Sequence, residues 1–192
     1  FDWVGEVAIP KNPQRIAQTQ KLHSLTFVTG RRDSRMLAPA PNDFVLWFKK
    51  PGTHPHPVKC LYEENLNPAG WVTTDEWINW AHGCWPDILE IDTLDGWKSA
   101  REEDDERHVC PLQLDVIRRC IKLYSNPGET VLDPFMGIGS TAYVAREQWR
   151  SAVGFELKES YYQQSLANLA KLETELAKPA EADLFSMAGI AL

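Results

Sequence analysis

Residues 131–142 read Val-Leu-Asp-Pro-Phe-Met-Gly-Ile-Gly-Ser-Thr-Ala, and this stretch decides the fold. A short apolar run ends in Asp133, two glycines follow in a tight turn, and the residues from Ser140 onward favour a helix. Glycines let a ligand approach the backbone, and a helix N-terminus offers N–H groups that have no partner inside the helix. The pattern predicts a strand, a turn and a helix that together hold a small ligand.

A second short strand is predicted at residues 151–156, and it also ends in an acid, Glu156. In a parallel strand-helix-strand unit, an acid at this place binds ribose hydroxyls. Apolar periodicity predicts an amphipathic helix over 111–124, and a last helix is predicted at about 159–177. The order of these elements predicts an α/β fold of three layers, Rossmann-like, with a parallel sheet.

The first 50 residues predict two further strands, at residues 4–9 and 42–49. The second is nearly all apolar, which is typical of a strand buried on both faces. The long polar connection between them predicts a functional or mobile loop. Trp77 and Trp80 lie at helical spacing, which favours a place in the core for both.

The composition is that of an ordinary soluble protein, with 43% hydrophobic and 24% charged residues. No apolar run approaches the roughly 20 residues of a membrane span, and the first residues show no signal region. Four cysteines without paired spacing fit a reducing cytoplasm. Without a membrane span we expect no membrane partner. No zinc-binding spacing of His and Cys is present, so we expect no metal site.

The net charge of −7 hides a basic N-terminal region. Residues 1–60 hold nine Lys and Arg against four Asp and Glu. Basic side chains can contact phosphates, and a solvated basic surface is the alternative. The predicted DNA-contacting residues in the connection are Arg15, Lys21, Arg31, Arg32 and Arg35.

The glycine spacing alone leaves two cofactors open. Gly137, Gly139 and Ala142 also fit the dinucleotide fingerprint, so a nicotinamide-dependent oxidoreductase is one alternative. In that fold the strand runs almost directly into the first glycine, whereas Asp133-Pro134-Phe135 intervenes here. An acid at the strand end can face an ammonium group, and an aromatic ring can pack beside a purine.

Asp-Pro-Phe-x-Gly-x-Gly-Ser-Thr resembles the S-adenosylmethionine motif of the amino-group DNA methyltransferases, which methylate adenine N6 or cytosine N4. Residues 107–114 with 126–128, and residues 154–162, are similar to the segments that flank this motif in the family. Residues 1–50 resemble the final strands of its catalytic half. The order matches the permuted class, in which the catalytic half precedes the cofactor half.

The resemblance implies S-adenosyl-L-methionine as cofactor and double-stranded DNA as partner, in a bacterial or phage-infected cytoplasm. Asp133 would face the methionine ammonium, Phe135 would lie near the sulfonium end, and Glu156 would bind the ribose. Gly137 and Gly139 would allow close approach, with Ser140 beside them. His108 and Thr141 would contact the carboxylate end, or serve as a helix-entry contact and an N-terminal cap.

The resemblance also implies a division of the chain. Residues 1–50 would be terminal strands of the catalytic half, 51–107 the target-recognition segment, 108–178 the cofactor-binding half, and 179–192 a loose tail. A homodimer is compatible with this division.

One family motif is missing. The family carries a catalytic loop of the form Asp/Asn/Ser-Pro-Pro-aromatic, but this sequence contains no Pro-Pro pair, so no catalytic residue is assigned. We expect these 192 residues to be the C-terminal part of a longer enzyme, whose N-terminal portion is not in this sequence. The alternatives are that a second chain carries the loop, or that the chain is an inactive relic. A further alternative for the function is a non-catalytic DNA-binding or regulatory subunit with a degenerate methyltransferase fold.

Overall fold

The structure, a computed structural model, describes residues 1–61, 71–96, 98, 100 and 111–177. The chain divides into two compact units. The N-terminal unit comprises residues 1–57 and 74–88, and the C-terminal unit comprises residues 58–73 and 89–192. The predicted target-recognition segment is thus shared between the units, while the predicted tail lies outside the described residues.

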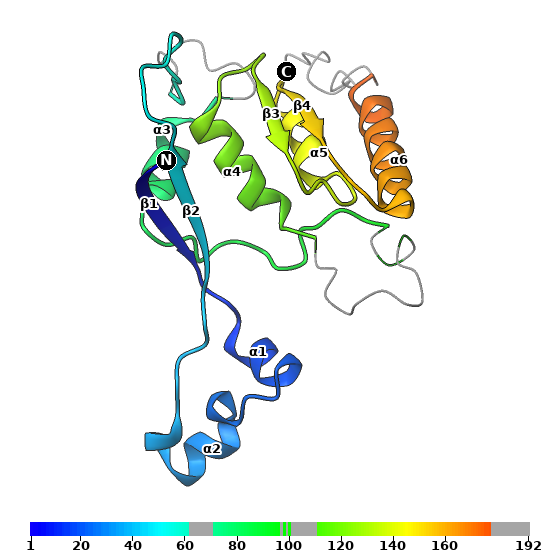
Figure 1. The fold of residues 1–192 in the computed structure, drawn as a ribbon. Coiled ribbons are helices and arrows are strands. Elements are labelled where there is room, and N and C mark those ends of the chain that lie inside the picture. Colours follow the sequence, from blue (N-terminus) through cyan, green and yellow to red (C-terminus); the bar gives the residue numbers. More distant parts are fainter. Residues whose placement is uncertain (62–70, 97, 99, 101–110, 178–192) are drawn as a thin grey trace, which may run out of the picture. The chain divides into compact units, whose positions relative to one another are not determined.

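The predicted parallel strand-helix-strand arrangement is present in the C-terminal unit (Figure 1). β3 (Thr130–Asp133) and β4 (Ser151–Gly154) pair in parallel, and α5 (Ser140–Glu147) connects them. The last helix, α6 (Glu159–Leu176), follows β4 as predicted. No helix within the described ranges is both long and apolar enough to cross a membrane.

The predicted amphipathic helix is α4 (Leu114–Tyr124), and its apolar stripe packs against α5. Each fully buried aliphatic side chain contributes about 1.5–3 kcal/mol to folding, so this contact stabilises the unit by several kcal/mol. The buried cluster comprises Leu94, Ala100, Leu114, Ile117, Ile121, Ile138, Val144 and Ala145.

Two arginines form hydrogen bonds near the C-terminal ends of α4 and α5. Arg150 is 2% exposed and donates to the Ser125 carbonyl and the Gln148 carbonyl, each at 2.6 Å. Arg118 of α4 donates from Nε to the Glu147 carboxylate of α5 at 2.7 Å. Because buried polar groups must be paired, these bonds hold the turn after α4 and the turn after α5 in place.

In the N-terminal unit, β1 (Asp2–Ile9) and β2 (Asp43–Lys49) form an antiparallel ribbon. The inward face of β1 buries Val7 and Ile9, and Trp85, only 1% exposed, is buried in the same unit. The Trp85 backbone N–H donates to the carbonyl of Ala8 at 2.8 Å. The chain after α3 (Thr74–Trp80) therefore pairs with β1.

Two expectations about burial in this unit are wrong. The predicted strand at 42–49 forms, but Phe44, Leu46 and Phe48 are 55%, 51% and 54% exposed. Alternate residues of a strand point to one face, and nothing in the described part of the chain covers this face of the ribbon. Trp77 is 42% exposed, because helical spacing defines a shared face without showing which face is buried.

The expected loop between the two strands is largely helical. Asn12 caps α1 by accepting from the N–H groups of Gln14 and Arg15, and the Thr26 hydroxyl caps α2. These helices are too short to show apolar periodicity, so their sequence signals are the capping residues and, for α1, the proline at its first position. We call residues 12–38 the arginine segment; it holds α1 (Pro13–Thr19), η1 (His23–Leu25), α2 (Phe27–Arg32) and η2 (Ser34–Met36).

Candidate functional site

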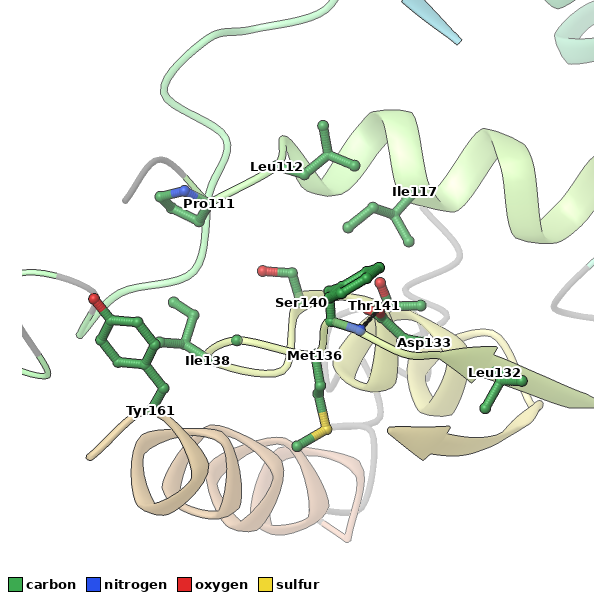
Figure 2. Close-up of a pocket in the computed structure, with 12 residues that line it drawn as sticks. Pro111, Leu112, Ile117, Leu132, Asp133, Met136, Ile138, Ser140, Thr141 and Tyr161 are labelled. Carbon is green, nitrogen blue, oxygen red and sulfur yellow. Dashed lines mark hydrogen bonds between the residues drawn. The ribbon is translucent and has the colours of Figure 1, made fainter. Parts of the chain in front are cut away.

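A pocket of about 540 Å³ lies at the turn between β3 and α5 (Figure 2). Its volume falls within the range of about 300–1,000 Å³ that is usual for small-molecule sites. Its position, at the carboxyl ends of parallel strands, is where open α/β sheets bind ligands. The lining residues are Pro111, Leu112, Ile117, Leu132, Asp133, Phe135, Met136, Gly137, Ile138, Ser140, Thr141 and Tyr161.

The two sides of the pocket differ in chemistry. Leu112, two residues before α4, and Ile117, in the first turn of α4, form an apolar wall (Figure 2). Ser140 and Thr141, at the start of α5, lie across from them with their hydroxyl groups (Figure 2). The pocket can therefore hold a ligand that has an apolar surface on one side and hydrogen-bonding groups on the other.

The turn that forms the polar side depends on two glycines with positive φ. Gly137 has φ +54° and Gly139 has φ +89°, a region that L-residues with a Cβ rarely adopt. Gly139 occupies the N-cap position of α5, without a capping side chain. Thr141 is therefore not the N-cap. The first N–H groups of α5 point toward the end of the helix that lies at the pocket.

Backbone hydrogen bonds join the turn to the end of β4. The Phe155 N–H donates to the Asp133 carbonyl at 3.0 Å, and the Met136 N–H donates to the Phe155 carbonyl at 2.9 Å. The Asp133 carboxylate accepts from the Phe135 N–H at 2.9 Å. These bonds hold Asp133 at the strand end with its side chain at the pocket.

Glu156 supports the turn from the second strand. One carboxylate oxygen accepts from the Gly137 N–H at 2.8 Å, and the other accepts from the Lys158 N–H at 2.8 Å. Hydrogen bonds to a charged carboxylate are stronger than neutral ones. Each carboxylate oxygen has a second lone pair, so Glu156 retains capacity to accept from a ligand hydroxyl.

Helix α6 holds the turn from the side of the core. The buried Asn168 donates its side-chain amide to the Ile138 carbonyl at 2.9 Å. Ser165, 0% exposed, packs so tightly that a Cβ placed on Gly139 would lie 2.9 Å from the Ser165 Cβ. The sequence gives no signal of this support, because neither residue belongs to a local motif.

The structure brings together most of the predicted cofactor residues. Five of them line the pocket, namely Asp133, Phe135, Gly137, Ser140 and Thr141. Gly139 and Glu156 belong to the turn and its support, and His108 lies outside the described residues. The apolar wall was not predicted as part of the site, although Leu112 and Ile117 were assigned to the neighbouring amphipathic helix.

The predicted DNA-contacting side chains are all exposed on the arginine segment. Arg35 is engaged by Asp33, with Nη2 at 2.7 Å from Oδ2. This bond raises the pKa of Arg35 and lowers the pKa of the Asp33 carboxyl. Arg35 is therefore partly neutralised, so Arg31 and Arg32 at the end of α2 carry more of the available positive charge.

No group of three His, Cys, Asp or Glu side chains in the described ranges could hold a metal ion. Burial raises the pKa of the Cys120 thiol to about 11. Because the thiolate is the metal-binding form of cysteine, Cys120 is a poor metal ligand near neutral pH.

Comparison with known proteins finds methylases. The family model N6_N4_Mtase, a DNA methylase, matches residues 17–167. Type II methyltransferase M.BglI of Bacillus subtilis is 36% identical over 99 residues, which cover 51% of this chain and 25% of that protein. Type II methyltransferase M1.MboII of Moraxella bovis is 41% identical over 66 residues, covering 34% of this chain and 25% of that one.

A similar solved structure is that of TTHA0409, a DNA modification methylase of Thermus thermophilus, in complex with S-adenosyl-L-methionine. It aligns with a TM-score of 0.58 and 20% identity, over 90% of this chain and 54% of that chain. This likeness confirms the predicted fold class. The chain spans about half the length of this structural neighbour and a quarter of the two curated relatives.

Substitution by alanine should destabilise the protein to different extents at the two glycines of the turn. Gly139→Ala should lower the free energy of unfolding by about 2–4 kcal/mol, because positive φ and overlap with Ser165 both penalise a Cβ. For Gly137→Ala, no described residue other than its chain neighbours lies within 4 Å of the added Cβ, so the substitution should cost only about 1–2 kcal/mol. Urea denaturation measures both, and equal losses would contradict the role assigned to the Gly139–Ser165 contact.

Proposed function

This chain belongs to the DNA methylase family, and we propose that it binds S-adenosyl-L-methionine and double-stranded DNA for methyl transfer to an exocyclic amine, adenine N6 or cytosine N4. The observation that carries this proposal is the pocket beside the glycine turn, where an acid, an aromatic residue and a helix N-terminus converge. The family match favours this function over the nicotinamide-dependent alternative.

The residues present fit this cofactor. Asp133 is an acid at a strand end, suited to an ammonium group. Glu156 has acceptor capacity for ribose hydroxyls. Gly137 has open space where a Cβ would lie, so a ligand can approach the backbone there.

S-adenosylmethionine, when bound, supplies an electrophilic methyl group on a sulfonium. The chain's own residues bind and orient. Asp133 and Glu156 would fix the two polar ends of the cofactor, and the apolar wall of Leu112 and Ile117 would exclude water from its apolar part. Phe135 is 88% exposed and would cover the ligand from the open side.

The sequence has no Pro-Pro-aromatic loop, which in this family would accept the hydrogen bonds of the target amine. A segment outside these 192 residues would supply those acceptors, either in the same polypeptide or in a second chain. A sheet face that no described residue covers supports a further segment. Leu132 and Val153 pair in register and are 62% and 48% exposed. Parallel sheets are almost always covered on both faces, so a polypeptide would pack on this one.

The missing loop also favours a second candidate, a non-catalytic DNA-binding or regulatory subunit. Radiolabelled methyl transfer to plasmid DNA separates the two. The 192-residue chain should be inactive by itself, and addition of a polypeptide carrying the loop should restore transfer. If no such polypeptide restores activity while DNA binding persists, the non-catalytic function stands.

Calorimetry tests cofactor binding. The chain should bind S-adenosylmethionine and not NADH. Glu156→Gln should weaken binding about tenfold, because a neutral amide is a poorer acceptor for ribose hydroxyls than a carboxylate. Glu159→Gln, an exposed glutamate at the start of α6, is the matched control and should bind normally. Unchanged affinity in Glu156→Gln, with a normal melting temperature, would contradict the ribose assignment.

Salt titration tests DNA contact by the arginine segment. The logarithm of the binding constant should fall linearly with the logarithm of salt concentration, and each phosphate contact contributes about −0.9 to the slope. Arg32→Gln should therefore make the slope shallower by about 0.9. Arg146→Gln, which removes an arginine paired with Glu173, should leave the slope unchanged. An unchanged salt slope in Arg32→Gln would argue against DNA contact by this residue.

A further inference from the structure

We propose that the outer face of α2 inserts an apolar side chain, Phe27, into the base stack of duplex DNA while Arg31 and Arg32 hold the flanking phosphates. The inference rests on the proposed function, because it assumes that the arginine segment contacts DNA. It adds a device that the sequence motifs did not suggest, namely a wedge that opens the duplex.

The outer face of α2 alternates apolar and cationic side chains. Phe27 lies four residues before Arg31, and Val28 lies four residues before Arg32, so each pair shares one side of the helix. Phe27 is 68% exposed and Val28 is 63% exposed, and both arginines are exposed as well. An aromatic ring and an aliphatic side chain thus stand in solvent beside two guanidinium groups.

Phe27 and Val28 contribute little to the buried part of the arginine segment, because most of each side chain is exposed. The buried apolar side chain of this segment is Leu25, and a Cβ placed on Gly30 would lie 3.5 Å from the half-exposed side chain of Leu37. The Thr26 hydroxyl caps the helix by accepting from the Thr29 N–H at 3.3 Å. Because other residues supply the packing and the cap, the exposed apolar side chains are available for a partner.

Charge indicates what the partner is. Residues 12–38 hold five Lys and Arg against a single acid, Asp33, and that acid is engaged by Arg35. A surface that is both cationic and apolar fits a polyanion with an apolar interior. DNA meets both conditions, because its phosphates are anionic and its stacked bases are apolar. Proteins that kink DNA insert Phe, Leu, Ile or Met between base steps in this way.

Insertion would serve the proposed reaction directly. The exocyclic amine of a paired base lies within the stack, so an enzyme that modifies it must extrude the nucleotide, at the cost of unstacking. An apolar side chain that enters the stack replaces part of the lost stacking. Phe27 would then be a positioning residue for the target base rather than a catalytic residue.

Fluorescence anisotropy with the full chain tests this inference, using a labelled duplex that is either intact or carries one abasic site. Since an abasic site removes most of the unstacking cost, the wild type should bind that duplex about tenfold more tightly. Phe27→Ser should reduce the preference to about twofold or less while keeping the salt slope. Phe27→Leu should retain the preference, because it keeps an apolar wedge.

Phe44→Ser is the matched control, since Phe44 is an exposed aromatic residue outside the arginine segment, at 55%. Its preference for the abasic duplex should match the wild type. Binding of both duplexes without any preference, or a preference unchanged in Phe27→Ser, would overturn the insertion and leave the proposed DNA contact intact. Absence of all DNA binding would overturn the DNA contact itself. Phe27-dependent binding to phosphatidylglycerol vesicles in place of DNA would also overturn the inference.

Discussion

The carboxylate of Glu156 accepts hydrogen bonds from the N–H groups of Gly137 and Lys158, each at 2.8 Å, and the candidate site depends on this contact. It joins the glycine turn after one strand to the helix start after the next. Asn168 adds a buried bond from α6 to the Ile138 carbonyl in the same turn. A turn with positive φ at two positions is costly for most sequences, and here it is held from two sides. The pocket has its shape because the turn is held in this way.

The same residue therefore has two roles. Glu156 maintains the turn through backbone donors and would bind ribose with its remaining lone pairs. A carboxylate can do both, because each oxygen accepts more than one hydrogen bond. A substitution that removes the charge affects both roles, which is why stability and ligand affinity have to be measured together.

Charge and apolar surface are distributed differently in the two units. The N-terminal unit carries the cations of the arginine segment beside exposed apolar residues of α2, which suits a polyanion with an apolar interior. The C-terminal unit carries the pocket and leaves Leu132 and Val153 exposed on a parallel sheet. Each exposed surface has its own chemistry, and each indicates a different kind of partner.

The amino-acid sequence by itself determined the strand-turn-helix around Asp133 and Gly139, the amphipathic α4 and the acid at Glu156. These features depend on contacts close in sequence: apolar periodicity, glycine at positive φ, and acids that directly follow strands. Only the tertiary structure decided that Ser165 and Asn168 support the turn, because a contact between α6 and a turn some 30 residues earlier leaves no local pattern. Burial was also undetermined by sequence: Phe44 and Trp77 have the residue types of a core, but a side chain is buried only if another element covers its face.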